Sequence, residues 1–230
     1  MQPGENYGAV AASVEEEARR SGREAGEVRL IAVSKTVGLE AVDRAIALGA
    51  RDFGENRPDC LVEKASARPD VRWHFIGNIQ SRRIPDIVAY ADLVHSLFQM
   101  SHAEKISAAA VARGKVQDVL VEVNVSGEES KGGLAPADVP GFVREALGLP
   151  GLRVAGLMTM APQGDSEAAR ETFEGLARLR DEVAAELDAE DAAAFKELSM
   201  GMSEDWPEAV RCGATMVRIG RAVFSDMFVG

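Results

Sequence analysis

The sequence predicts a single α/β domain over residues 1–230, a (β/α)8 TIM-like barrel with an extra N-terminal helix. Two observations predict this fold. Strand-like apolar runs alternate with alanine-rich, charge-bearing stretches of helical periodicity, which is the pattern of a parallel sheet. About eight such units follow one another with short connections, as in a closed barrel. A doubly wound open sheet is the alternative, because periodicity does not distinguish a closed sheet from an open one.

The predicted strands are short runs of apolar and β-branched residues. They are expected at residues 29–34, 51–53, 72–76, 93–97, 118–126, 152–159, 197–200 and 215–219. The predicted helices carry alanine and charged residues, with apolar positions at helical spacing. After an N-terminal helix within residues 5–25, they are expected at 39–48, 58–66, 101–113, 136–147, 166–187 and 204–212. Residues 188–196 are expected to form an exposed connection.

The composition argues against several classes of function. The net charge of −11 argues against a nucleic-acid-binding protein, which needs a basic surface to neutralise phosphates. No apolar run approaches the roughly 18–20 residues that cross a bilayer, so no membrane association is expected. The N-terminus shows no secretory signal, and Cys60 and Cys212 have neither metal-ligand spacing nor disulfide density. A cytoplasmic protein with reduced thiols is expected.

Lys35 is the most informative residue, because it follows the apolar run of the first predicted strand. In a parallel barrel the carboxyl ends of all strands meet at one rim, which carries the site. A lysine at this rim has its stem in an apolar wall, and partial desolvation favours its neutral amine. A neutral amine attacks an aldehyde, which is how lysine forms a Schiff base with pyridoxal phosphate. A solvated lysine at the end of a strand is the alternative.

The segments around the last two predicted strands suggest a phosphate site. The turn from Ser199 to Ser203 is expected to leave backbone N–H groups free at the start of a helix, although a plain turn is the alternative. Gly220 allows a second backbone segment to approach closely, and barrels often bind phosphate between these loops. Arg218 is expected either to form a salt bridge or to place a cation beside the ring nitrogen of pyridoxal phosphate, keeping that nitrogen unprotonated.

The three histidines, His74, His95 and His102, are expected to have structural or hydrogen-bonding roles. A three-histidine metal site would require them to converge, and no carboxylate lies beside them at ligand spacing. No metal site is therefore predicted. Glu204 and Asp205 are expected to cap the helix that follows the seventh strand.

A series of motifs runs in order along almost the whole chain. They are Ala-Val-Ser-Lys-Thr (32–36), Phe-Gly-Glu-Asn (53–56), Trp-His-Phe-Ile-Gly-Asn-Ile-Gln (73–80), Val-Asn-Val-Ser-Gly-Glu-Glu-Ser-Lys (123–131), Gly-Leu-Met-Thr-Met (156–160), Leu-Ser-Met-Gly-Met-Ser-Glu-Asp (198–205) and Met-Val-Arg-Ile-Gly (216–220). Together they resemble the motifs of the pyridoxal phosphate homeostasis proteins, whose barrel is similar to the N-terminal domain of bacterial alanine racemase. The sequence departs from the pattern of this family at Arg57-Pro58 and at Arg82-Arg83.

The resemblance implies a protein that binds pyridoxal 5'-phosphate, carries it as a lysine Schiff base and maintains its intracellular homeostasis without robust catalysis of its own. It implies that Lys35 is the Schiff-base lysine and that Asn56 lies near the cofactor ring. The full set of implied cofactor-binding residues, with no catalytic residue and no metal ligand among them, is Lys35, Asn56, Ser199, Gly201, Arg218 and Gly220.

A pyridoxal phosphate-dependent racemase or a related enzyme is the alternative function. Racemases with this barrel use a tyrosine from an additional domain, whereas the only tyrosines here, Tyr7 and Tyr90, are expected away from the rim. We therefore favour a carrier, with pyridoxal phosphate and the apo-enzymes that accept it as partners. Without a second domain to brace two copies, a monomer is expected.

Overall fold

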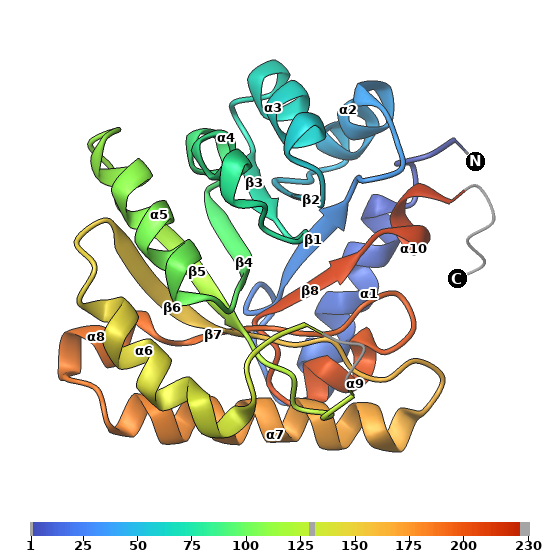
Figure 1. Ribbon diagram of the computed structural model, residues 1–230. Helices are drawn as coiled ribbons and strands as arrows, with labels where there is room; N and C mark the ends of the chain where they lie inside the picture. Colours follow the sequence, from blue (N-terminus) through green and yellow to red (C-terminus); the bar gives the residue numbers. More distant parts are fainter. Residues whose placement is uncertain (1, 129–131, 226–230) are drawn as a thin grey trace.

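The computed structural model describes residues 2–128 and 132–225 and shows a closed barrel of parallel strands (Figure 1). The strands pair in sequence order, and β8 pairs with β1 to close the sheet. Their bounds are β1 Arg29–Val33, β2 Asp52–Glu55, β3 Arg72–Phe75, β4 Leu93–Leu97, β5 Gln117–Glu122, β6 Leu152–Met158, β7 Glu197–Ser199 and β8 Met216–Ile219. The predicted barrel is confirmed, and the alternative of an open sheet is wrong.

Helices cover the outside of the barrel and connect its successive strands (Figure 1). The extra N-terminal helix, α1, packs against α9 and α10. The bounds are α1 Tyr7–Arg20, α2 Leu39–Ala47, α3 Pro58–Ala67, α4 Ile84–Tyr90, α5 Met100–Val111, α6 Val139–Leu147, α7 Ser166–Ala185, α8 Ala189–Ala194, α9 Trp206–Arg211 and α10 Arg221–Phe224, with short 3-10 helices at Ser81–Arg83 and Pro136–Asp138.

The first strand shows how the sequence builds two cores. Leu30 and Ala32 belong to the large core between the strands and the surrounding helices. Ile31 belongs to a separate small core with Leu120 and Met216. Because these residues come from strands on different sides of the ring, the small core fills the interior of the barrel. Burial on both faces explains why the strands are continuous apolar runs rather than alternating ones.

Some short elements differ from the prediction. Residues 188–196, expected to be a connection, contain α8, because the Asp188 carboxylate accepts the N–H groups of Glu190 and Asp191 and caps a run of alanines. Helices α4 and α10 are absent from the prediction, since 7 and 4 residues are too few to show a helical period. The predicted strand 118–126 ends earlier, at Glu122.

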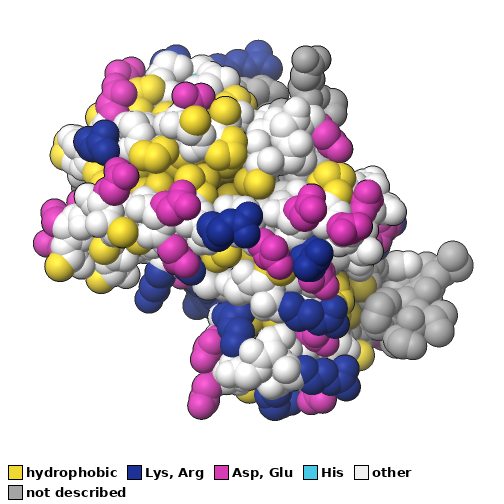
Figure 2. Space-filling view, turned by 90° about the horizontal axis from the view of Figure 1, so that it is seen from below, with side chains coloured by type: hydrophobic (Ala, Val, Ile, Leu, Met, Phe, Trp, Pro, Cys, Tyr) yellow, Lys and Arg dark blue, Asp and Glu magenta, His cyan; other side chains and the backbone are white. Residues whose placement is uncertain are grey.

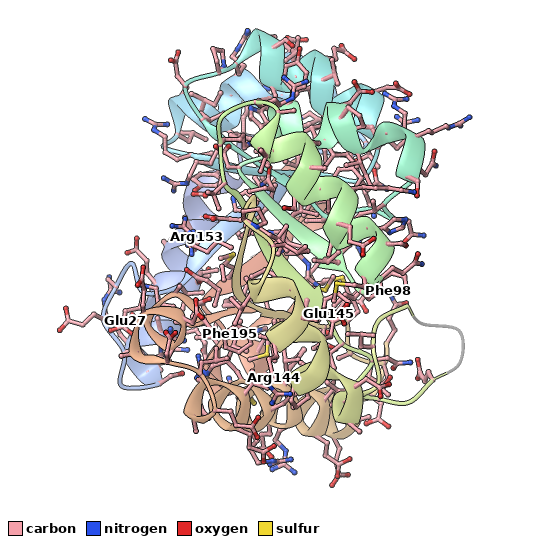
Figure 3. The ribbon with its side chains drawn as sticks, turned by 60° about the vertical axis from the view of Figure 1, so that its left-hand side comes forward. Glu27, Phe98, Arg144, Glu145, Arg153 and Phe195 are labelled. Carbon is pink, nitrogen blue, oxygen red and sulfur yellow. The ribbon has the colours of Figure 1, made fainter. Side chains whose placement is uncertain are left out.

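Ion pairs connect neighbouring strands at the amino-terminal end of the barrel. Asp52 of β2 pairs with Arg72 of β3 at 2.6 Å. Asp118 of β5 pairs at 2.5 Å with Arg153 of β6, which is labelled in Figure 3. In both pairs the two residues are direct cross-strand partners, so the register of the sheet itself brings the charges together.

The molecular surface mixes charges of both signs. On the face shown in Figure 2, acidic and basic side chains are interspersed, so the negative net charge is not gathered into a patch there. Among residues 2–128 and 132–225, no helix combines the length and apolar character needed to cross a membrane.

Candidate functional site

A cavity of about 1230 Å³ opens at the carboxyl-terminal end of the barrel, the end at which barrel proteins carry their sites. Its floor contains Val33, Ile76 and Met158, which come from or directly follow three strands. The loops after the strands form its walls. Of the residues that the resemblance implies, the lining contains Lys35, Asn56, Arg218 and Gly220.

Lys35 lines the cavity two residues beyond the end of β1, and its side chain is exposed to solvent. The expected burial of its stem in an apolar wall is therefore wrong, because the chain turns outward after the buried Ser34. The preceding backbone is held firmly. The N–H of Ser34 donates to the Gly54 carbonyl at 3.0 Å, and the Ser34 carbonyl accepts from Lys64 Nζ at 2.8 Å.

A buried ion pair supports this segment from behind. Lys64, which is 4% exposed on α3, donates from Nζ to Glu55 Oε1 at 2.5 Å, and the Ser34 hydroxyl donates to the same oxygen at 2.7 Å. The other carboxylate oxygen, Glu55 Oε2, has no partner within the described part of the chain. Sequence reasoning missed this pair. The available signal was a lysine on the apolar face of a predicted helix, next to Leu61 and Ala65.

Asn56 follows β2 and lines the cavity with an exposed side chain. The loop after β3 passes directly against its backbone at Gly77. A Cβ atom at position 77 would lie 2.0 Å from the Asn56 carbonyl oxygen. Only glycine therefore allows the two rim segments to cross at this point.

Arg218 lies at the bottom of the cavity and is 5% exposed. Its Nη1 donates to Ser199 Oγ at 2.7 Å, and its Nη2 donates to the Thr159 carbonyl at 3.0 Å. No salt bridge to Arg218 is found among the described residues, so the alternative that Arg218 serves only as a salt-bridge partner is not supported. Burial lowers the pKa of Arg218 to about 10, against the opposing charges of Asp205 and Glu122.

Ser199 and Gly201 lie behind the cavity lining rather than in it. Ser199 is fully buried at the end of β7, where its hydroxyl meets Arg218. Gly201 has a φ of +90°, and a Cβ there would lie 2.5 Å from the Ala209 Cβ atom. Its carbonyl accepts the N–H of Arg218 at 2.9 Å. Both residues thus hold Arg218 and the loop in place.

Free backbone donors also line the cavity. Within the described chain, no acceptor is found for the N–H groups of Ser203, Glu204, Gly220 and Arg221, which all border the cavity. The sequence predicts free donors for the turn from Ser199 to Ser203, and Ser203 has one, whereas the N–H groups of Met200 and Met202 have acceptors. Asp205 does not cap α9 with its side chain, because its Oδ1 accepts the N–H of Met202 at 2.5 Å instead.

The histidines form hydrogen bonds, as predicted. His74 Nδ1 and His95 Nε2 are 2.9 Å apart, and His95 Nδ1 lies 2.9 Å from Ser199 Oγ. His102 contacts the Ser81 hydroxyl. Sequence reasoning missed Asp52, whose Oδ1 lies 3.0 Å from His74 Nε2. Burial raises the pKa of Asp52, but hydrogen bonds, from His74 above all, lower it overall to about 2.

Comparisons with known sequences agree with this architecture. Residues 6–227 match the family described as alanine racemase, N-terminal domain. The chain is 41% identical over 222 residues to the pyridoxal phosphate homeostasis protein of Pseudomonas aeruginosa, covering 96% of this chain and 94% of the relative. It is 37% identical over 229 residues to the protein of the same name from Aquifex aeolicus, covering 98% and 99% of the two chains.

Solved structures share the fold. A protein from Bifidobacterium adolescentis has a TM-score of 0.89 at 35% identity, covering 95% of this chain and 93% of that one. PipY of Synechococcus elongatus, solved with PLP bound, has a TM-score of 0.79 at 30% identity, covering 92% and 100%. An alanine racemase of Clostridium difficile shares the fold alone, at 14% identity and a TM-score of 0.71 over 93% of this chain and 55% of that one. This chain therefore belongs to the pyridoxal phosphate homeostasis proteins, within the family of the alanine racemase N-terminal domain.

Proposed function

We propose that this protein binds pyridoxal 5'-phosphate as a Schiff base with Lys35 and maintains the supply of this cofactor in the cell. The observation that carries the proposal is that a primary amine, a buried guanidinium and free backbone donors border one cavity. The related PipY, which was solved with PLP bound, gives independent support.

The chemistry of the donor set fits this cofactor. The Lys35 amine suits an aldehyde, and the N–H groups of Ser203, Glu204, Gly220 and Arg221 suit a phosphate. Bound pyridoxal phosphate supplies an electron sink whose strength depends on the charge at its ring nitrogen. The pKa of Arg218, about 10, leaves the guanidinium protonated at neutral pH, so it donates hydrogen bonds without acting as a strong acid.

A carrier is better supported than a racemase. Two-base racemisation needs an acid or base on the face of the cofactor opposite the lysine. Among the described residues that line the cavity there is no tyrosine. Tyr7 lies on α1, and Tyr90 lies at the end of α4. A guanidinium beside the ring nitrogen would also disfavour carbanion formation.

Borohydride trapping followed by peptide mapping tests the proposal. The reduced label should lie on Lys35, and Lys35→Ala should lose both the label and the absorbance band of the Schiff base. Lys105→Ala, on the exposed side of α5, is the matched control and should retain both. A label on another lysine would refute the assignment. Robust α-proton exchange of amino acids in deuterated water would instead favour the racemase.

The proposal also includes the delivery of pyridoxal phosphate to apo-enzymes. The exposed position of Lys35 makes its imine accessible to an incoming lysine from a second protein. We expect a cytoplasmic monomer that transfers the cofactor on direct contact. Mixing the loaded protein with a pyridoxal phosphate-dependent apo-enzyme should restore the activity of that enzyme faster than the cofactor is spontaneously released from the carrier. A rate equal to spontaneous release would contradict this mode of delivery.

A further inference from the structure

A chain of hydrogen bonds runs through the interior of the barrel from Arg218 towards the opposite end. Arg218 Nη1 lies 2.7 Å from Ser199 Oγ, which lies 2.9 Å from His95 Nδ1. His95 Nε2 lies 2.9 Å from His74 Nδ1. His74 Nε2 lies 3.0 Å from Asp52 Oδ1. The chain therefore connects the floor of the cavity to the ion pairs at the amino-terminal end.

The three middle members of this hydrogen-bond chain have almost no access to water. Ser199 and His95 are 0% exposed, and His74 is 1% exposed. Buried polar atoms need partners within the protein, so each ring nitrogen must be satisfied by its neighbour in the chain. This requirement determines where the hydrogen atoms lie.

The Asp52 end of the hydrogen-bond chain determines which atom donates in each bond. Asp52 accepts two hydrogen bonds from the Arg72 guanidinium, at 2.7 and 2.6 Å, so it is an anion that only accepts hydrogen bonds. His74 Nε2 must then carry a hydrogen and donate it. In a neutral ring, Nδ1 of His74 is an acceptor, and it takes the hydrogen on His95 Nε2. His95 Nδ1 is left as an acceptor facing Ser199.

The Arg218 end of the hydrogen-bond chain leads to the same assignment of donors and acceptors. Arg218 only donates, so Ser199 Oγ accepts from it and directs its own hydrogen to His95 Nδ1. A second proton on His74 would reverse the bond between the rings and turn His95 Nδ1 into a donor. The hydroxyl hydrogen of Ser199 would then lose the one acceptor found for it among the described residues.

We infer that His95 and His74 are positioning residues for Arg218, because they anchor it to Asp52 through a hydrogen-bond chain with a single direction. The chain commits the Ser199 hydroxyl to His95, so this hydroxyl cannot donate to a ligand. With Nη2 held by the Thr159 carbonyl, the guanidinium is fixed at two nitrogens. The consequence for pyridoxal phosphate rests on the proposed function, whereas the direction of the chain does not.

Nitrogen-15 NMR of the cofactor-free full chain tests the direction itself. Single histidine substitutions assign the three histidines. We expect His74 and His95 each to carry a proton on Nε2 and none on Nδ1. A proton on Nδ1 of either ring would overturn the inference, whether or not the protein binds pyridoxal phosphate.

A pair of aspartate variants tests the anchor. Asp52→Ala should broaden or average the ring signals of His74, because its Nε2–H loses an anionic acceptor. Asp118→Ala removes the matched cross-strand pair between Asp118 and Arg153. No contact of this pair with a histidine is found among the described residues, so the ring signals of His74 should stay unchanged. Unchanged signals in Asp52→Ala would overturn the anchoring role.

Two substitutions of His95 test the effect on the ligand. His95→Asn keeps an acceptor near the Nδ1 position and loses only the bond to His74, so its affinity for pyridoxal phosphate should fall about twofold. His95→Gln places its polar group nearer the Nε2 position, so affinity should fall about tenfold and the absorbance band should shift. Equal effects of the two substitutions would overturn the positioning role. If the parent protein failed to label at Lys35, the proposed function would fail while the NMR result would stand.

Discussion

The two ends of the barrel use the same kinds of side chain in opposite ways. At the amino-terminal end, Asp52 and Asp118 each meet an arginine across the sheet, and Arg29 pairs with Glu197. At the carboxyl-terminal end, the amine of Lys35 and several backbone donors face a cavity without such partners in the described chain. The amino-terminal end, here called the closed end, thus neutralises its own charges. The carboxyl-terminal end, the open end, contains the Arg221–Glu204 ion pair but also keeps the Lys35 amine and backbone donors available for an anionic ligand.

The two arginines Arg72 and Arg218 show the difference most clearly. Arg72 has a side chain that is 54% exposed, and yet it has a carboxylate partner at 2.6 Å. Arg218 is 5% exposed, and its hydrogen-bond partners among the described residues are only a hydroxyl and a carbonyl. Burial without a counter-ion is costly, so stability alone would favour the reverse arrangement. This contrast suggests that the charge of Arg218 is kept for a ligand.

The largest expected effect on stability concerns the buried ion pair between Lys64 and Glu55, which supports the rim at the open end. Lys64→Met leaves the buried Glu55 carboxylate without its cation, and we expect a loss of about 3–5 kcal/mol in the free energy of unfolding. Urea denaturation measures this loss. Lys105→Met, at an exposed position, should cost far less. Equal losses in the two variants would show that the pair is not essential to the rim.

The next effect concerns the closed end and depends on pH. The pKa of Asp52 is about 2 in the folded protein, below its ordinary value of 3.8. A lowered pKa means that the stabilisation is complete above pH 4 and is lost as the pH falls towards 2. Asp52→Asn should therefore cost about 2 kcal/mol at pH 7 and progressively less below pH 4. A difference that stayed constant between pH 6 and pH 3 would contradict this assignment.

Much of this fold follows from the sequence. Most strands are buried on both faces and form apolar runs, and these runs place them to within a few residues. The short helices α4 and α10 escape prediction because so few residues reveal no period. Helix α8 escapes it because its formation depends on the Asp188 cap in a polar stretch.

Part of the candidate site could be predicted from the sequence, and part of it depends on contacts that a sequence does not show. Lys35, Asn56, Arg218 and Gly220 line the cavity, since a residue at the end of a barrel strand reaches the rim whatever its neighbours are. The sequence left the exposure of Lys35 open as the alternative, because this exposure depends on how the loop leaves the strand. The bond between Asp52 and His74 depends on pairing between strands, which a single sequence does not display.

Removal of Arg218 should weaken ligand binding rather than folding. Arg218→Leu takes away the buried cation of the open end, and we expect affinity for pyridoxal phosphate to fall about tenfold, as for the loss of one charged hydrogen bond. Absorbance titration measures the change. Arg153→Leu, at the closed end, should bind as the parent protein does. Similar losses in both variants would mean that the two ends do not differ in function.

The smallest effect is expected at the exposed pair between Arg153 and Asp118. The Arg153 side chain is 58% exposed, so water and salt screen its attraction to the carboxylate despite the 2.5 Å contact. Arg153→Gln should lower the free energy of unfolding by about 0–1 kcal/mol, and 1 M salt should remove the difference. Urea denaturation at low and high salt measures both. A loss as large as that of Lys64→Met would mean that the closed end depends on each of its ion pairs, and not on the sheet register that brings them together.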